Sequence, residues 1–271
     1  MDTWDIRRYE AFFLDADGVL IRDRQPIDGA AEAIGCLRRI GRVLILTNNS
    51  TRSRRQHASL LSDLGFDVSP EEVVASAYVA ARHLQQTYGR VLVWPIAEQG
   101  LIDELLACDH RLAARPEEAD WVVVGMDRAI DYRKLADGLR ALGHGARLLA
   151  TNEDGTYPTP DGPMPGAGSI VGAFRGMGFE PGISLGKPSP ALYETALNLT
   201  HVERSRVLMI GDRLETDIEG AVRCRLDSLL VMTGISRRED ITPSGIEPTW
   251  VADSLSVAVA GHVTPGQDAA K

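Results

Sequence analysis

Two carboxylates separated by a single residue stand directly after an apolar run, in the segment AFFLDADGVL. They are Asp15 and Asp17, and Gly18 follows them. Such a pair suits a nucleophile and an acid/base partner, because one carboxylate can attack while the other moves a proton. The main chain between them can also turn a carbonyl toward a cation. The alternative is an Asp/Gly turn that simply ends a strand.

A hydroxyl and two side-chain amides follow another apolar run, in VLILTNNST. Thr47, Asn48 and Asn49 could bind a phosphate through the hydroxyl and the main-chain N–H groups. Lys187 stands in SLGKPSPALY and could supply positive charge for phosphate oxygens and for paired carboxylates. Taken singly, an ordinary helix N-cap and a solvated surface lysine are the commoner explanations of these two segments.

Two further aspartates follow a third apolar run, in VLMIGDRLETDI. Asp212 and Asp217 carry hard oxygen ligands that suit Mg²⁺, although loop solvation and helix capping explain each of them alone. The four aspartates together would crowd negative charge at one place, which is unfavourable at low effective dielectric. A divalent cation and Lys187 would relieve that repulsion, and the same arrangement accepts a phosphate dianion. The combination therefore predicts a magnesium-dependent phosphate site.

The elements that must position these residues are short strands and amphipathic helices. Apolar runs rich in Val, Ile and Leu predict strands buried on both faces. These runs are Ala11–Leu14, Val43–Leu46, Val91–Trp94, Trp121–Val124, Arg147–Ala150, Ile183–Leu185, Val207–Ile210 and Ser228–Met232. Helical spacing predicts helices over Ala30–Arg39, Ser53–Leu64 and Pro190–Leu199. The alternation indicates an α/β fold with a parallel sheet, at whose C-terminal strand ends ligands bind.

The candidate residues gather near the two ends of the chain. They lie before Ser50 and after Ile183, whereas the middle carries its own alternation of strands and helices. We therefore interpret residues 81–182 as an inserted domain. Residues 1–80 and 183–271 would then form one discontinuous core domain.

Composition narrows the class of protein. The 271 residues carry a formal net charge of −9, so most of the surface should repel nucleic acid. Three cysteines without a CxxC pair favour a reducing cytosol over a disulfide framework or a zinc site. No apolar run approaches the roughly 18 residues of a membrane helix, and MDTWDIRRYE lacks an apolar signal core. We expect a cytoplasmic protein with no nucleic-acid or membrane partner.

The candidate segments, in this order, resemble the four motifs of the haloacid dehalogenase (HAD) superfamily. The nucleophile, phosphate-binding, lysine and metal motifs are matched by Asp15-Ala16-Asp17-Gly18-Val19, Thr47-Asn48-Asn49, Lys187 and Gly211-Asp212-Arg213-Leu214-Glu215-Thr216-Asp217. The stretches LTNNSTRSR, ATNEDGTYPT, GPMPGAGS and GDRLETDI are similar to signatures of subfamily IIA. That subfamily is the NagD-type group of p-nitrophenyl, phosphoglycolate, glycerol-phosphate and pyridoxal-phosphate phosphatases. The resemblance runs from about Ala11 to Gly234.

This resemblance implies a Rossmann-like parallel-sheet core with an inserted α/β cap domain of the C2 type. Such caps close over small substrates, exclude water and often mediate homodimers. The implied partners are a small-molecule phosphate ester and a second copy bound through the cap. Tyr157 lies in the segment of the cap that reaches the substrate in this family, which makes it the candidate specificity residue. The alternative is a packed loop tyrosine.

The resemblance also implies a catalytic or metal-binding role for each matched carboxylate. Asp15 attacks phosphorus and becomes phosphorylated, while Asp17 protonates the leaving oxygen and then deprotonates the attacking water. Asp15, the main-chain carbonyl of Asp17 and Asp212 coordinate Mg²⁺, and Asp217 holds a metal-bound water. Asp17 further favours a phosphatase or a mutase, because the dehalogenases of the superfamily lack this second carboxylate.

Phosphate contacts are implied for Thr47, for the amides of Asn48 and Asn49, and for Lys187, which stabilise the charge of the transferring phosphoryl group.

One departure from the family pattern concerns the backbone. Arg225 stands where a glycine is usual at a helix end, and a left-handed conformation there would cost roughly 1 kcal/mol.

The leading hypothesis is a magnesium-dependent phosphatase of small phosphomonoesters, such as sugar, glycerol, glycolate or nucleotide phosphates. A phosphotransferase or mutase would use the same aspartyl phosphate with a different acceptor. A non-catalytic protein that binds phosphorylated metabolites would need no nucleophile, so the pair of Asp15 and Asp17 argues against it.

Overall fold

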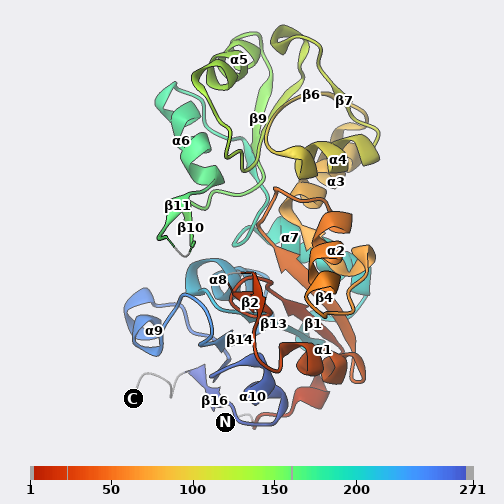
Figure 1. Cartoon of the computed structure of the whole chain (residues 1–271), viewed down its shortest axis with the longest axis vertical. Coiled ribbons are helices and arrows are strands. Elements are labelled where there is room, and N and C mark those ends of the chain that lie inside the picture. The colour runs from red at the N-terminus through yellow and green to blue at the C-terminus, as the bar shows by residue number, and fades with distance from the viewer. Residues whose placement is uncertain (1–2, 23, 160, 267–271) are drawn as a thin grey trace. The chain divides into compact units, whose positions relative to one another are not determined.

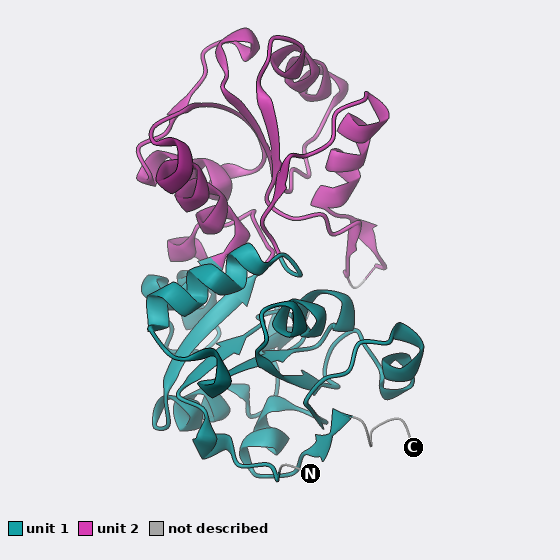
Figure 2. Ribbon diagram, turned by 180° about the vertical axis from the view of Figure 1, so that it is seen from behind, with its two compact units in different colours: residues 1–47, 58–74, 187–271 teal, residues 48–57, 75–186 magenta. Residues whose placement is uncertain are grey.

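The computed structural model describes residues 3–22, 24–159 and 161–266. The chain divides into two compact units, which Figure 2 shows in teal and magenta. Unit 1 comprises Met1–Thr47, Ala58–Val74 and Lys187–Lys271, and unit 2 comprises Asn48–His57 and Ala75–Gly186. The inserted domain predicted from the sequence spans residues 81–182. Unit 2 begins earlier and ends later than this, and it also includes a short segment after Thr47.

Unit 1 is built on a seven-stranded sheet with the order β16-β15-β14-β13-β1-β4-β5 (Figure 1). The strands are β1 (Ala11–Leu14), β4 (Arg42–Thr47), β5 (Val73–Ala75), β13 (Val207–Gly211), β14 (Asp227–Val231), β15 (Trp250–Ala252) and β16 (Thr264–Pro265). The pairs β4–β1, β1–β13, β13–β14 and β14–β15 are parallel, and β16 is antiparallel to β15. All four residues of β1 are buried, as expected for a strand at the centre of a parallel sheet.

Helices and short turns complete unit 1. The helices are α1 (Ala30–Arg38), α2 (Arg54–Asp63, whose first residues belong to unit 2), α7 (Pro190–Thr200), α8 (Glu219–Arg223), α9 (Arg238–Ser244) and α10 (Leu255–Val259). The 3₁₀ turns are η1 (Ile6–Arg8), η2 (Pro70–Glu72) and η4 (Arg204–Arg206); η5 (Leu214–Ile218) is π-helical, and β2 (Ile21–Arg22) pairs with β3 (Gln25–Pro26). Helix α1 packs against α10 and β4, and α7 packs against α8 and β4.

Unit 2 has a parallel five-stranded sheet of its own, with the order β12-β9-β8-β6-β7. The strands are β6 (Leu92–Ile96), β7 (Arg111–Leu112), β8 (Trp121–Val124), β9 (Arg147–Ala150) and β12 (Ile183–Ser184); β10 (Thr156–Tyr157) and β11 (Met164–Pro165) form a separate antiparallel pair. The helices are α3 (Ser76–Tyr88), α4 (Gln99–Ala107), α5 (Tyr132–Gly143) and α6 (Ala167–Gly176), with a 3₁₀ turn, η3 (Pro116–Glu118).

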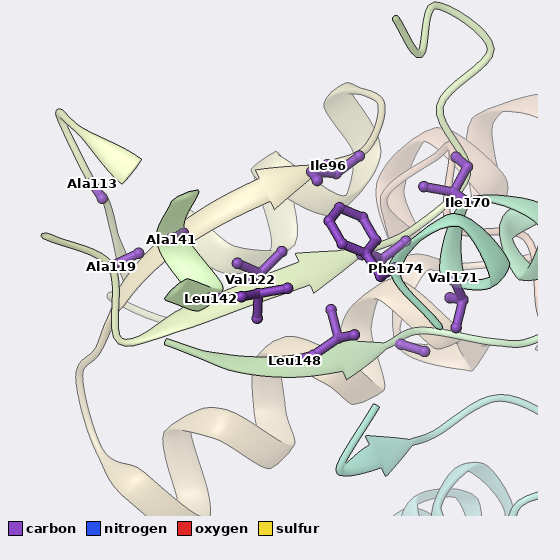
Figure 3. Close-up of a cluster of buried hydrophobic side chains, with 12 residues drawn as sticks. Ile96, Ala113, Ala119, Val122, Ala141, Leu142, Leu148, Ile170, Val171 and Phe174 are labelled. Carbon is purple, nitrogen blue, oxygen red and sulfur yellow. The ribbon is translucent and has the colours of Figure 1, made fainter. Parts of the chain in front are cut away.

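One apolar cluster of unit 2 lies between its sheet and two of its helices. Figure 3 shows side chains of β6, β8 and β9 facing those of α5 and α6, with Phe174 among them. Helix α5 can approach closely because Gly138 lacks a side chain: a Cβ there would lie 2.7 Å from Ile96 Cδ1 and from Phe174 Cζ. Unit 2 therefore has an apolar core of its own.

The predicted α/β class with a parallel-sheet core is confirmed, and so are the predicted strands and helices. Arg225, where a left-handed backbone was considered from the sequence, has φ 56° and lies one residue beyond Cys224, the C-cap of α8. No helix within the described residues is long and apolar enough to cross a membrane.

Candidate active site

The carboxyl ends of three neighbouring strands are level in unit 1. Leu14, the last residue of β1, lies opposite Ile45 of β4 and Ile210 of β13. The next residue, Asp15, continues the ladder because its N–H donates to the carbonyl of Ile210 at 2.9 Å. This register places Asp15, the end of β4 and the loop after β13 at one edge of the sheet.

Lys187 connects these segments through its ammonium group. Its Nζ donates to Asp15 Oδ1 at 2.6 Å, to Asp217 Oδ1 at 2.7 Å and to the carbonyl of Leu46 at 3.1 Å. The lysine is buried, with 4% of its surface exposed. A buried ammonium needs such partners, since losing water without them would be strongly unfavourable.

Asp217 is held by the turn that carries it. Its Oδ2 accepts hydrogen bonds from the main-chain N–H groups of Asp212 (3.2 Å) and Arg213 (3.1 Å), while Oδ1 accepts from Lys187. The π-helical turn η5 is anchored by Leu214 and Ile218, which belong to an apolar cluster of unit 1. Single π-turns are frequent at functional sites. Both carboxylate oxygens of Asp217 therefore have protein partners.

Three carboxylates converge beside the lysine. One oxygen each of Asp15, Asp212 and Asp217 lies within 4.8 Å of the others, and all three residues are buried. Asp212 Oδ2 also accepts a hydrogen bond from the N–H of Ile235 at 2.8 Å. The cluster thus holds more negative charge than the single ammonium of Lys187 balances.

Burial and this excess of negative charge together raise the pKa values of two carboxyl groups in the cluster. Burial raises the pKa of Asp15 well above its usual value; Lys187 opposes that rise, and the carboxylates of Asp217, Asp212 and Asp17 add to it. Burial, followed by the charge of Asp217, raises the pKa of Asp212 to about 7. For Lys187, burial opposes the charged form, but Asp15 and Asp217 outweigh it and raise its pKa.

The donor set fits a hard divalent cation. Carboxylate oxygens are the ligands that Mg²⁺ and Ca²⁺ prefer, and a second positive charge would balance the remaining carboxylates. Asp15 and Asp212 are suited to hold such an ion, whereas Asp217 is already bonded to Lys187 and to two main-chain amides.

Asp17 lies just beyond this cluster and, unlike Asp15, is exposed. Its charge adds to the rise in the pKa of Asp15, by less than the charges of Asp217 and Asp212 do. The turn after it is tight, because Gly18 has φ 84° and a Cβ on it would lie 2.5 Å from Asp212 Cγ. The glycine thus lets the loop after β1 approach the loop after β13.

The phosphate-binding candidates divide between the two units. Thr47 is buried and ends β4, directly after the Leu46 carbonyl that Lys187 binds. Asn48 and Asn49 follow it but belong to unit 2. Tyr157 also belongs to unit 2, where it is partly buried in β10. In unit 1 the structure thus brings Asp15, Asp212, Asp217 and Lys187 together, next to Thr47, while Asp17 is exposed two residues after Asp15.

Sequence reasoning missed the loop after β14, which braces the site. The Thr233 hydroxyl donates to the carbonyl of Gly18. Ser236 donates its N–H to the Asp212 carbonyl at 3.0 Å, and its hydroxyl accepts from the N–H of Leu214 at 3.0 Å. The loop therefore links the segment of Asp15 to that of Asp212. A usable signal existed, because TGIS follows a predicted strand just as the recognised motifs do.

Replacing Gly234 with alanine should weaken binding of the metal ion severely. A Cβ on Gly234 would overlap Asp212 Oδ2, so the carboxylate has to move. We expect an affinity for Mg²⁺ about 10-fold or more below that of the wild type, measured by calorimetric titration. Gly35→Ala is the matched control, because nothing lies within 4 Å of a Cβ there, inside helix α1. Unchanged Mg²⁺ affinity in Gly234→Ala would refute the bracing role of this loop.

Comparison with known proteins yields two family matches. Residues 12–111 match the model of haloacid dehalogenase-like hydrolases, and residues 184–258 match a HAD-hydrolase-like model. A curated relative, the acid sugar phosphatase of Staphylococcus epidermidis, is 34% identical over 258 residues, covering 94% of this chain and 98% of the relative.

Solved structures agree with these matches. The p-nitrophenyl phosphatase from Archaeoglobus fulgidus has a TM-score of 0.89 and 32% identity, covering 94% of this chain and 99% of that one. The glycerol phosphate phosphatase Rv1692 from Mycobacterium tuberculosis, in complex with magnesium, has a TM-score of 0.86 and 35% identity, covering 94% of this chain and 78% of that one.

Proposed function

Because the chain belongs to the haloacid dehalogenase-like hydrolases, in their NagD-type phosphatase group, we propose that it is a Mg²⁺-dependent phosphatase of small phosphorylated metabolites. The observation that carries this proposal is the convergence of Asp15, Asp212 and Asp217 on the buried Lys187. Phosphoryl transfer requires a nucleophile held in a fixed direction, a positive charge beside it and hard oxygen ligands for a metal ion.

The reaction proceeds in two displacements at phosphorus. In the first, a carboxylate oxygen of Asp15 forms a bond to phosphorus while the ester P–O bond breaks, and Asp17 gives its proton to the leaving oxygen. In the second, Asp17 takes a proton from water, whose oxygen bonds to phosphorus while the Asp15–phosphorus bond breaks. Asp15 and Asp17 return to their initial states. The covalent intermediate divides one difficult step into two easier ones.

The other residues of the site orient these two groups and stabilise charge. Lys187 holds Asp15 Oδ1, which fixes the direction of the carboxylate, and it offers positive charge to the phosphoryl oxygens. The Thr47 hydroxyl and the amides of Asn48 and Asn49 are assigned to the same oxygens. A bound Mg²⁺, held by Asp15, Asp212 and the carbonyl of Asp17, would supply further positive charge as a Lewis acid.

The substrate class is a small phosphomonoester. Relatives named for acid sugar, p-nitrophenyl and glycerol phosphate hydrolysis support it, as does the net charge of −9, which disfavours nucleic acid. We assign to unit 2 the role of the cap domain, and to Tyr157 within it the role of a specificity residue. A homodimer would form through this cap. The cysteine content favours the cytoplasm as the place of action.

A phosphate-release screen tests this function. The purified chain is incubated with Mg²⁺ and a panel of glycerol phosphates, phosphoglycolate, sugar phosphates, nucleotides, pyridoxal phosphate and p-nitrophenyl phosphate. We expect release from at least one small ester and none when EDTA removes the metal. Faster transfer to an added sugar hydroxyl than to water would instead identify a phosphotransferase. Tight binding of these esters without turnover would identify a binding protein.

Stability should depend on pH and on Mg²⁺ together. In the metal-free protein, the pKa of Asp212 rises from 3.8 to about 7, so the folded state binds this proton more tightly than the unfolded chain. The associated stability is present below about pH 4 and is lost as the pH rises through about 7. Because Mg²⁺ needs the deprotonated carboxylates, its stabilising effect should be small at about pH 5 and large at about pH 8.

Thermal unfolding with Mg²⁺ or EDTA, measured across this pH range, checks that dependence. The Asp212→Asn variant is the control, since it should lose most of the stabilisation by Mg²⁺ and part of the pH slope. Equal stabilisation by Mg²⁺ at about pH 5 and about pH 8 would contradict the account of the acidic cluster.

A further inference from the structure

The main-chain carbonyl of Asn48 is bound by two buried donors of unit 2. Asn152 Nδ2 donates to it at 2.8 Å and the Ser76 hydroxyl at 2.7 Å. The orientation of the Asn152 amide is determined, because its Oδ1 accepts from the N–H of Asp154 at 3.1 Å. Ser76 is fully buried, and Asn152 has only 4% of its surface exposed. Two such donors on one loop carbonyl hold it in a defined direction.

The surroundings leave this carbonyl little room to move. Asn48 Nδ2 donates to Asp154 Oδ2 at 3.0 Å, so the side chain is held as well as the main chain. Gly186 packs against the same group: a Cβ on it would lie 2.5 Å from Asn152 Cβ and 2.7 Å from Asn48 Oδ1. All these residues belong to unit 2.

Fixing this carbonyl also fixes the amide that follows it. The carbonyl of Asn48 and the N–H of Asn49 belong to one planar trans peptide group and point in opposite directions. The next peptide group is held in the same way, since His57 Nε2 lies 3.0 Å from the carbonyl oxygen of Asn49. A carbonyl oxygen only accepts, so Nε2 carries the proton. Burial lowers the pKa of His57 to about 4, which keeps the ring neutral.

We propose that Asn152 and Ser76 are positioning residues that set the direction of the Asn49 N–H toward the substrate phosphoryl group. This inference rests on the proposed function, which assigns that amide to phosphate. The two residues act through the Asn48 peptide group and do not touch the substrate. An amide aimed in advance stabilises charge without reorganising during the reaction, so their effect falls mainly on the transition state.

The test measures kinetics and inhibition by orthovanadate in Ser76→Ala and Asn152→Asp. Asn152→Asp keeps an oxygen for the N–H of Asp154 but turns a second oxygen toward the Asn48 carbonyl, so kcat should fall about 10²-fold with little change in KM. Ser76→Ala keeps the Asn152 donor, so its kcat should fall only several-fold. Vanadate imitates the transition state, so its affinity as an inhibitor should fall in proportion to kcat/KM. Affinity for Mg²⁺ should not change, because the acidic cluster lies in unit 1.

Ser169→Ala is the matched control in unit 2, because its hydroxyl also donates to a main-chain carbonyl, that of Gly155, at 2.8 Å. It should keep wild-type kinetics. Wild-type kcat and vanadate inhibition in Ser76→Ala, or in folded Asn152→Asp, would overturn the inference while leaving the phosphatase assignment intact. A wild-type protein that releases no phosphate from any ester would overturn the proposed function itself.

Discussion

Replacing Asp15 with asparagine should lower the rate of phosphate release by about 10⁴-fold or more, while the protein remains folded. An amide is too weak a nucleophile to attack phosphorus, so neither displacement can begin. Stability should not fall, because the substitution removes one buried charge from a cluster with excess negative charge. Lys187 keeps Asp217 as its partner in this variant. Initial rates and thermal unfolding measure the two effects.

Asp63→Asn is the control for this change, since Asp63 is exposed at the end of α2. It should leave both the rate and the melting temperature close to those of the wild type. Turnover by Asp15→Asn within about 10-fold of the wild type would show that another group attacks phosphorus.

Replacing Lys187 with methionine should damage both activity and stability. The ammonium donates to the carboxylates of Asp15 and Asp217, and the three groups are buried together. Removing one partner of a buried ion pair typically costs about 3–5 kcal/mol, because the remaining charge is left uncompensated. We expect a loss of this size without Mg²⁺, and a fall in kcat of about 10²–10³-fold with it.

A second substitution separates the two effects. Asp217→Asn in the Lys187→Met background removes one unpaired carboxylate, so it should restore part of the stability and none of the activity. Lys134→Met is the control: it breaks a comparable contact, 2.6 Å from Nζ to the buried Asp127 Oδ2, but within unit 2. It should lower stability and leave kcat unchanged. A stable, active Lys187→Met protein would contradict the electrostatic account.

The sequence predicted the strands well because burial on both faces leaves a continuous apolar signal. Leu14, Ile45 and Ile210 end such runs, and the polar residues after them fall at one edge of the sheet in any parallel arrangement. The positions of Asp15, Thr47 and Asp212 at strand ends follow from this rule. The strands β15 and β16 escaped prediction because they are only three and two residues long, too short for a clear apolar run.

Features that depend on contacts distant in sequence could not be predicted. Asp217 shares its oxygens between Lys187 and two amides only because η5 folds back as a π-helical turn. The bracing of Asp212 by Ser236 and Gly234 depends on the packing of one loop against another. Periodicity and propensity describe single segments, so they carry no information about such pairs.

The division into units illustrates the same limit. The insertion was inferred from the positions of the candidate residues and from the separate strand–helix alternation between them. Neither signal can reveal that Asn48 belongs with Asn152, 104 positions later. Its carbonyl is bound by Ser76 and Asn152, and these bonds place the segment after Thr47 in unit 2. The conformation of Arg225, by contrast, was predictable, because the end of a helix imposes a local backbone requirement.

The most direct test of the central claim is to trap the covalent intermediate on Asp15. The Asp17→Asn variant should accumulate it from p-nitrophenyl phosphate, because this leaving group departs without a proton while the group that activates water is gone. The variant is mixed with p-nitrophenyl phosphate and Mg²⁺, quenched in acid, treated with borohydride and digested for mass spectrometry. We predict that the Asp15 carboxyl is reduced to an alcohol only when substrate is present. The account would be contradicted if the wild type released phosphate from this substrate while the variant showed no modification of Asp15, or showed modification of another residue instead.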